Sequence, residues 1–282
     1  MANTETVLCT DLDRTVIPNG VQPESPEARP RLRRFAARPE STLVYVTGRH
    51  KALLEAAIRD YDLPIPDYAI GDVGTTIYQV MGGEWRPWRA WSDEIAPDWR
   101  GYDGEAIAGL LANLDDLRLQ EPEKQNDFKL SFYAPVGTRP EPLLAEIRER
   151  LDRHRIRASL IWSVDEAADS GLLDVLPAAA NKLHAIRFLM RKKGFNETQT
   201  VFSGDSGNDL EVLVSGLQAV LVRNAPDDIR EEAMEKVAMA GYPDRLYIAR
   251  GGFLGMNGNY AAGVLEGLAH FLPHVAEWLE PG

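Results

Sequence analysis

Short apolar runs alternate with segments whose apolar residues recur every three or four positions along most of the chain. In the first part, strands are expected at Thr6–Thr10 and Ser41–Thr47, and helices at Pro26–Ala37 and His50–Tyr61. Pro66–Tyr78 is expected to be a third strand with a turn marked by glycine. This alternation of strands and helices predicts a parallel sheet covered by helices on both faces.

The same alternation returns toward the C-terminal end of the chain. Strands are expected at Gly171–Pro177, Thr198–Asp205 and Gln218–Asn224. Helices are expected at Asn181–Gly194, Asp209–Gly216, Pro226–Gly241 and Tyr260–Phe271. We therefore assign residues 1–80 and 169–282 to one α/β core domain with a Rossmann-like parallel sheet.

Residues 81–168 read as a separate α+β module inserted into that core. Its pattern gives a helix, the strand Asp127–Pro135, the helix Pro140–His154 and the strand Arg157–Val164. Tryptophans recur at every third position near its start, and burial at the domain junction is the favoured interpretation, with a sugar-stacking platform as the alternative. These tryptophans are Trp85, Trp88 and Trp91.

Composition indicates a globular protein of 282 residues with 44% hydrophobic and 26% charged residues, enough for two domains. The single cysteine, Cys9, lies inside the first apolar run, which predicts a buried side chain and fits a reducing compartment. The first nine residues lack the regions of a signal peptide, and no apolar stretch approaches a membrane span. We therefore expect a cytoplasmic protein without a membrane partner.

Charge narrows the choice of ligand. The formal net charge of −12 argues against nucleic acid as a partner. The one basic cluster, Arg29–Pro39, mixes arginine with apolar residues and is typical of the solvated face of an amphipathic helix. A phosphorylated ligand would be repelled at long range, so a site for one needs local cations.

Two carboxylates, Asp11 and Asp13, follow the first strand two positions apart. Residues at this spacing point to one side of a strand, and the carboxyl ends of parallel strands border the ligand crevice. Two like charges in one place raise the cost of ionising each other, and a divalent cation removes that cost. Taken alone, the pair is also compatible with a chance arrangement or with the metal site of a nucleotide-sugar transferase.

Three further stretches place polar groups at strand ends or helix starts. Thr47, Gly48 and Arg49 end the second strand, and Lys182 begins a helix. Gly204–Asp209 follows another strand and puts Asp205 at the strand end and Asp209 at a helix start, where the dipole favours carboxylates. Each stretch alone has an ordinary structural explanation, but their order and context indicate one site.

At these positions the chain resembles the haloacid dehalogenase superfamily of phosphatases, and the resemblance covers nearly the whole chain. The inserted module is similar to the cap of the Cof-type branch, and within that branch the chain looks most like the sucrose-phosphate phosphatases. The stretches that carry the resemblance are Asp11–Thr15, Thr47–Arg49, Gln125–Tyr133, Leu173–Lys182 and Gly204–Leu213, with Val220–Ile229 and Gly263–Phe271. The mannosylfructose-phosphate phosphatases share most of them.

The resemblance implies a mechanism with which the residue types agree. Asp11 would be the nucleophile that forms an aspartyl-phosphate, and Asp13 would donate a proton to the leaving sugar oxygen and later activate water. Mg²⁺ would be held by Asp11, the backbone carbonyl of Asp13, and Asp205. The remaining implied roles are phosphate binding by Thr47, Gly48, Lys182 and Asn208, and support by Thr15, Arg49 and Asp209.

Two positions depart from the family pattern. Arg14 stands where a small or neutral residue is common; we expect it to face solvent or form a salt bridge, with phosphate capture as the alternative. Thr76 stands where these phosphatases often carry a glutamate, which weakens the sugar assignment. For sugar contacts the resemblance to the cap strand points to Gln125, Asn126 and Lys129.

These features favour a Mg²⁺-dependent phosphatase of a disaccharide phosphate, with sucrose 6-phosphate as the first candidate. Mannosylfructose phosphate, glucosylglycerol phosphate or another sugar phosphate is the alternative substrate, and a phosphomutase is less favoured. A sugar-phosphate synthase is a candidate partner, and a non-catalytic subunit of such a synthase is a second class of function. That subunit would not need Asp11, Asp13, Lys182 and Asp205, and a glycosyltransferase would not need Lys182.

Overall fold

The computed structural model describes residues 5–114, 117–135, 137–165 and 170–280. It contains two compact units, one made of Met1–Pro87 with Ala185–Gly282 and the other of Trp88–His184. The sequence placed the bounds of the insert at residues 81 and 168, and residue 168 lies outside the described residues. We call the two units the core and the insert.

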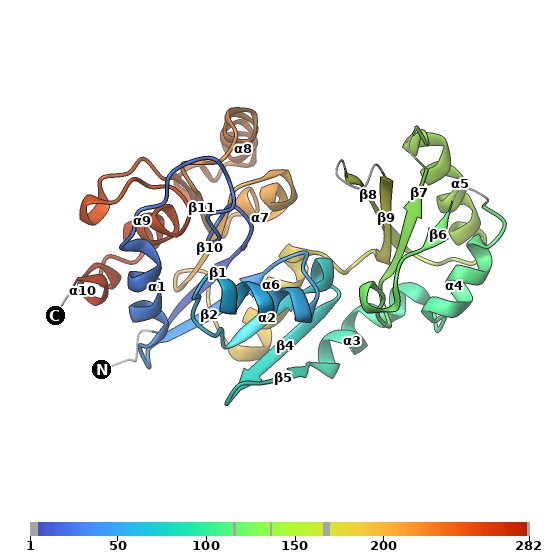
Figure 1. Cartoon of the computed structure of the whole chain (residues 1–282), viewed down its shortest axis with the longest axis horizontal. Coiled ribbons are helices and arrows are strands. Elements are labelled where there is room, and N and C mark those ends of the chain that lie inside the picture. Colours follow the sequence, from blue (N-terminus) through green and yellow to red (C-terminus); the bar gives the residue numbers. More distant parts are fainter. Residues whose placement is uncertain (1–4, 115–116, 136, 166–169, 281–282) are drawn as a thin grey trace. The chain divides into compact units, whose positions relative to one another are not determined.

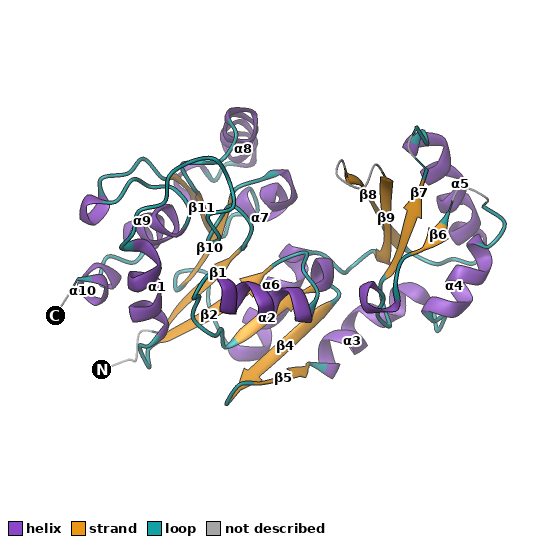
Figure 2. Ribbon diagram, viewed as in Figure 1, coloured by secondary structure: helices purple, strands orange, loops and turns teal. Residues whose placement is uncertain are grey.

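A single sheet of eight strands forms the centre of the core in the described residues, in the order β12-β11-β10-β1-β2-β3-β4-β5. Neighbouring strands from β12 to β3 are parallel, and this part confirms the predicted α/β fold (Figures 1 and 2). The bounds are β1 Thr6–Thr10, β2 Ser41–Val46, β3 Tyr68–Gly71, β4 Thr76–Met81, β5 Glu84–Pro87, β10 Thr200–Gly204, β11 Gln218–Leu221 and β12 Leu246–Ile248.

The edge of this sheet differs from the prediction of one strand at Pro66–Tyr78. Residues 72–74 turn the chain, so that β3 and β4 are separate antiparallel strands, and β5 pairs with β4. Gly82 and Gly83 connect β4 to β5 with φ angles of 59° and 83°, a conformation that glycine adopts without strain. A Gly-Gly pair between two extended runs is a hairpin signal, and the sequence analysis overlooked it.

Helices cover the core sheet. Leu8, Leu43 and Tyr45 point from the sheet into one buried cluster that also contains apolar residues of α1, α2 and α9. Helix α7 packs on β10 and β11, and α8 packs against α7. The bounds are α1 Ala28–Ala36, α2 Lys51–Asp60, α6 Lys182–Lys193, α7 Leu210–Leu213, α8 Asp227–Ala240, α9 Ala261–Phe271 and α10 Val275–Leu279.

The insert has its own antiparallel sheet, in the order β6-β7-β9-β8 among the described residues. Its apolar cluster joins Phe132 and Val175 of the sheet to Ile107 and Ile147 of the helices. Bounds are α3 Arg89–Ile95, α4 Gly104–Leu111, β6 Arg118–Leu119, β7 Leu130–Ala134, α5 Pro140–Arg153, β8 Ala158–Asp165 and β9 Ser170–Pro177.

Strand β9 corrects a prediction. The sequence analysis placed Gly171–Pro177 in the core sheet, but β9 pairs along its length with β8 and β7 in the insert. Periodicity shows that a segment is extended and which of its faces is apolar, and it carries no information on the sheet to which the strand belongs. The inserted α+β module therefore contains one more strand than the sequence pattern suggested.

The buried aromatic and thiol groups have packing roles. Trp91 is fully buried, and the Trp85 ring lies 5.8 Å from that of Tyr78 between centroids, whereas Trp88 is exposed. Cys9 is buried, and burial raises the pKa of its thiol to about 12, so it behaves as an apolar residue. Burial, the favoured interpretation for the tryptophans, therefore applies fully to Trp91.

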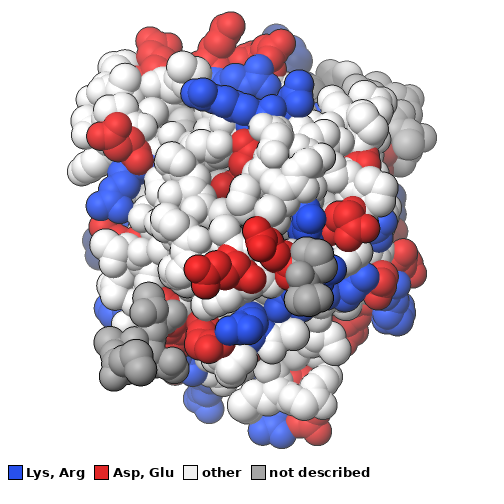
Figure 3. All heavy atoms as spheres, turned by 90° about the vertical axis from the view of Figure 1, so that its left-hand side faces the viewer, with Lys and Arg blue, Asp and Glu red and all other residues white. Residues whose placement is uncertain are grey.

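Acidic and basic side chains alternate over much of the core surface, and one group of Lys and Arg gathers at the upper edge of the face drawn in Figure 3. None of the helices in the described residues is both long and apolar enough to cross a bilayer.

Candidate active site

The catalytic candidates begin at the carboxyl end of β1, in the middle of the core sheet. The Asp11 amide donates to the Ser203 carbonyl at 2.9 Å, which extends the pairing of β1 with β10 by one residue. The Asp11 side chain is buried and that of Asp13 is 41% exposed, while Leu12 between them is fully buried. The strand end therefore offers one enclosed and one accessible carboxylate.

Asp205 follows the neighbouring strand β10 and joins Asp11 through a shared hydroxyl. The Thr15 hydroxyl lies 3.3 Å from Asp11 Oδ2 and 3.2 Å from Asp205 Oδ1. Thr15 is fully buried, so a single rigid side chain sets the spacing of two carboxylates from strands far apart in sequence. This contact fits the supporting role that the sequence suggested for Thr15.

Asp209 fastens the loop that carries Asp205. Its Oδ2 atom accepts the backbone amides of Asp205 at 3.1 Å and Ser206 at 3.3 Å. A Cβ atom on Gly204 would lie 2.6 Å from the Asp209 carboxyl group, so only glycine permits this packing. Asp209 therefore has a positioning role through its Oδ2 atom.

Asp11, Asp205 and Asp209 form an acidic cluster in which one ligand oxygen from each lies within 4.8 Å of the others, and all three are buried. Burial, followed by the charge of Asp209, raises the pKa of Asp205 to about 6. Three buried carboxylates repel one another, and a divalent cation with oxygen ligands removes this cost. The donor set therefore fits a hard metal ion.

Asp13 is held from two sides. The Arg49 guanidinium donates to its two oxygens at 2.5 and 2.8 Å, and this hydrogen bond is the main cause that raises the pKa of Arg49. The Asn19 amide donates to Asp13 Oδ1 at 2.8 Å and accepts from the Arg14 backbone amide, also at 2.8 Å. Such a bidentate pair fixes the direction of a carboxylate.

Sequence reasoning missed Asn19. Its distance from Asp13 along the chain follows no known strand or helix period, because residues 14–25 form an irregular loop. The only signal was the Pro18-Asn19-Gly20 turn, which predicts a bend and does not predict a partner for Asp13.

Arg14 occupies an unusual backbone conformation for its residue type. Its φ angle is 59°, in the left-handed region that favours glycine. Its side chain is 45% exposed, and its Nε atom lies 3.6 Å from Asp205 Oδ2. This geometry matches the favoured expectation of a solvent-facing or salt-bridged arginine.

The remaining phosphate-site candidates lie on several elements. Thr47 is buried at the end of β2, its hydroxyl accepts the Arg49 amide at 3.2 Å, and Gly48 beside it is exposed. Asn208 is exposed and accepts the Ser206 hydroxyl at 3.0 Å. Lys182 is buried at the first position of α6, in the stretch assigned to the insert. Thr47, Gly48 and Asn208 thus belong to the core with Asp11, while the structure assigns Lys182 to the other unit.

The three sugar candidates lie together in the insert, where two of them are tied to its backbone. The Gln125 amide donates to the carbonyls of Gln120 and Ser131 and accepts the Ser131 amide at 2.7 Å. Lys129 is buried, and its ammonium donates to the Ser131 hydroxyl at 2.7 Å. Asn126 caps the turn by accepting the Phe128 amide. Gln125 and Asn126 line a cavity of about 530 Å³ within the insert.

The parallel sheet, the paired aspartates after β1, the third aspartate after β10 and the inserted α+β unit together define a phosphatase of the haloacid dehalogenase superfamily. The chain matches the sucrose-6F-phosphate phosphohydrolase family over residues 4–272. It belongs to this family and is therefore an enzyme of the phosphatase class.

Individual relatives agree with this assignment. A solved sucrose-phosphatase from Synechocystis sp., in complex with sucrose and phosphate, is 25% identical with a TM-score of 0.69, covering 95% of this chain and 98% of that one. A mannosylfructose-phosphate phosphatase of Agrobacterium fabrum is 29% identical and covers 94% of this chain and 96% of the relative. A HAD-like protein of Nitrosococcus oceani is 59% identical, covering 98% and 74%.

Plant relatives are longer than this chain. Sucrose-phosphatase 1 of Nicotiana tabacum is 28% identical over 233 residues, which cover 79% of this chain and 51% of the relative. The chain therefore spans about half the length of the plant enzyme that it matches.

Proposed function

We propose that this protein is a Mg²⁺-dependent phosphatase that hydrolyses sucrose 6-phosphate to sucrose and phosphate through an aspartyl-phosphate on Asp11. The observation that carries the proposal is the cluster of Asp11, Asp205 and Asp209 beside an Asp13 held by Arg49. The cluster supplies an enclosed carboxylate for nucleophilic attack and an accessible one for proton transfer.

The two aspartates divide the work. Asp11 attacks phosphorus, the bond from phosphorus to the sugar oxygen breaks, and the sugar oxygen takes a proton from Asp13. Asp13 then removes a proton from the water that attacks the aspartyl-phosphate and releases inorganic phosphate. Arg49 and Asn19 keep the Asp13 carboxyl in one direction for both steps.

The metal assignment follows from the acidic cluster. Asp11 and Asp205 would hold Mg²⁺ through their carboxylates, with the backbone carbonyl of Asp13, and Thr15 sets the spacing of the two carboxylates. When bound, Mg²⁺ supplies a counter-charge for the aspartates and for the transferring phosphoryl group. Asp209 keeps the Asp205 loop in place through the backbone amides that it accepts.

The other site residues and the insert complete the proposal. Thr47, Gly48, Lys182 and Asn208 would bind the phosphoryl oxygens, and the insert would act as a cap that excludes water and reads the sugar. We also propose a cytoplasmic location, which suits a chain whose one cysteine is a buried free thiol.

The choice of sugar is supported by the family match and by the Synechocystis relative, which was solved with sucrose and phosphate. The Agrobacterium fabrum relative, a mannosylfructose-phosphate phosphatase, aligns over nearly its full length and supports mannosylfructose phosphate as a second candidate. The deciding experiment measures phosphate release from a panel of sugar phosphates with and without Mg²⁺. Release from no member of the panel in the presence of Mg²⁺ would overturn the proposed catalytic function.

Metal binding should compete with protons at Asp205. The raised pKa of about 6 means that the neutral carboxyl is favoured in the metal-free protein, so its contribution to stability is present below pH 3.8 and is lost as pH rises through 6. Mg²⁺ needs the charged form, so its apparent affinity should fall about tenfold per pH unit below that value. The measurement is the rise in Tm with Mg²⁺ between pH 5 and pH 7.

Replacing Asp205 by asparagine provides the control for this prediction. The variant should lower Mg²⁺ affinity by at least about 100-fold and remove most of the pH dependence of the Mg²⁺ effect. Equal Mg²⁺ affinity in Asp205→Asn and wild-type protein would show that Asp205 is not a ligand.

Lys129 should affect the sugar ester more than a small aryl ester. Lys129→Ala removes donors to the Ser131 hydroxyl and the Lys124 carbonyl, so the insert should lose about 1–3 kcal/mol of stability. Only the sugar ester fills a sugar pocket, so its kcat/KM should fall several times further than that of the aryl ester. Steady-state kinetics on both esters and urea unfolding provide the measurements.

Asp174 offers a matched control, because its carboxylate accepts the Ser131 hydroxyl at 2.5 Å and lies 3.5 Å from Lys129 Nζ. Asp174→Asn disturbs the same cluster and keeps the lysine. If it reproduces the selective loss, Lys129 acts only through the structure of the insert, and equal losses on the two esters of Lys129→Ala exclude a sugar contact.

A further inference from the structure

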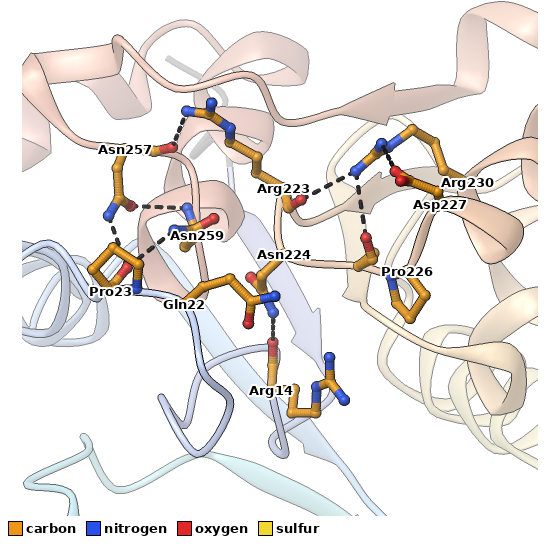
Figure 4. A pocket seen from close by; sticks show the side chains of 11 residues that line it. Arg14, Gln22, Pro23, Arg223, Asn224, Pro226, Asp227, Arg230, Asn257 and Asn259 are labelled. Atoms are coloured by element: carbon orange, nitrogen blue, oxygen red, sulfur yellow. Dashed lines mark hydrogen bonds and ion pairs between the residues drawn. The ribbon is translucent and has the colours of Figure 1, made fainter.

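A second cavity lies in the core, beside the acidic cluster. Its volume is about 630 Å³, which is within the range of small-molecule sites. Its lining comes from three loops, which follow β1, β11 and β12 at the carboxyl edge of the sheet (Figure 4). This edge is where open parallel sheets bind ligands.

Asparagine side chains fix the walls of this cavity. Asn224 donates to the Arg14 carbonyl at 2.6 Å and accepts the Tyr260 amide at 2.7 Å, so it joins all three loops. Asn257 and Asn259 both donate to the Pro23 carbonyl, at 2.8 and 3.0 Å. The cavity is therefore held open by hydrogen bonds within the core, and a ligand would not have to order its walls.

Three arginines line the cavity, and they face one acidic side chain there, Asp227. Arg230 pairs with Asp227 and also donates to the carbonyls of Arg223 and Ala225 (Figure 4). Arg223 donates to the Asn257 carbonyl at 3.0 Å. Carbonyl partners orient a guanidinium without neutralising it, so the lining keeps an excess of positive charge in a chain of net charge −12.

Helix α8 adds to this positive potential. The helix begins at Asp227, directly after the cavity residues Ala225 and Pro226, and runs for 14 residues. The first amides of a helix have no partner within it and favour an anion. The arginines and the helix end therefore attract the same kind of group.

We propose that this cavity is an anion-binding site for a small molecule that carries a phosphoryl or carboxylate group, separate from the catalytic aspartates. Arg223 and Arg230 bind the anion, and the fixed loops give the site its shape. The proposal goes beyond the phosphatase function and does not rest on it, because binding here requires neither Asp11 nor turnover.

Arg14 connects the anion site to the acidic cluster. Its side chain lines the cavity, and its Nε atom lies 3.6 Å from Asp205 Oδ2. An anion in the cavity competes with Asp205 for this guanidinium, whereas a cation at Asp205 repels it toward the cavity. Anion binding and Mg²⁺ binding should therefore strengthen each other, and by linkage the effect must be reciprocal.

The test uses thermal unfolding of the whole chain with sulfate as the probe for phosphoryl groups and malonate as the probe for carboxylates. Ionic strength is held constant with chloride. A ligand that binds the folded state raises Tm with a saturable dependence on its concentration. Arg223→Gln with Arg230→Gln should weaken the apparent affinity for the active probe about tenfold or more, since each charge-assisted bond is lost.

The matched control replaces Arg33 and Arg38, two partly exposed arginines of the core that pair with Asp62 and Glu40 outside the cavity. This control changes the net charge equally and should keep the wild-type response. If the double variant does not fold, Arg223→Glu replaces it, because Arg223 is exposed.

A crystal soaked in selenate locates the site. Anomalous density between Arg223 and Arg230 supports the proposal, and a response to sulfate alone or to malonate as well defines the chemical group. Selenate at the catalytic aspartates only, no saturable response to either probe, or an unchanged response in the Arg223 and Arg230 variants would overturn it.

Discussion

Asparagine at position 11 should reduce turnover of every phosphate ester by roughly 10⁵-fold or more, whatever the leaving group. An amide is a poor nucleophile, and the proposed reaction passes through a covalent bond from Asp11 to phosphorus. The fold should be retained, because asparagine has nearly the same shape and the neutral group removes one charge from a crowded cluster of buried carboxylates. Steady-state assays on a sugar phosphate and an aryl phosphate measure the loss.

Asp67→Asn is the matched control for that variant. Asp67 also precedes or follows a strand of the same sheet, but it lies before β3, at the opposite edge from Asp11, and its carboxylate accepts the Leu43 amide at 2.8 Å. This control should keep wild-type activity. Residual activity of Asp11→Asn within tenfold of wild type would mean that another group attacks phosphorus.

The sequence predicted most of the core because its signals are local. Each strand from β1 to β3 is a short apolar run, and the polar groups at their ends mark the edge where Asp11 and Asp205 meet. The helix positions follow from periodicity in the same way. Such features depend on residues within a few positions of one another, so no knowledge of the tertiary structure is needed.

The errors concern contacts between distant segments. Strand β9 looks like a core strand by itself, and only its pairing with β8 places it in the insert. The loop after β1 brings Asn19 back to Asp13 through an irregular path that no period describes. The network around Gln125 depends on backbone groups of residues 120 and 131, whose positions are set by the packing of β7.

Asp13→Asn should separate the two chemical steps of the proposed reaction. A sugar alkoxide is a poor leaving group and needs a proton, so its turnover should fall by about 10²–10⁴-fold. A nitrophenolate leaves without that help, and the aryl ester should still phosphorylate Asp11. Water attack then lacks its base, so the phospho-enzyme should accumulate, and rapid quench should show a burst of nitrophenol close to one per active site.

Arg49→Lys distinguishes proton transfer from mere positioning. Arg49 donates to both oxygens of Asp13, and lysine keeps a charge but cannot bind in this bidentate way. If Arg49 only orients Asp13, Arg49→Lys should slow both esters moderately and show no burst, since the base for the second step is retained. The absence of a burst in Asp13→Asn, with equal losses on the sugar and aryl esters, would show that Asp13 carries no proton in either step, and the role would then pass to a different group near the exposed end of β1.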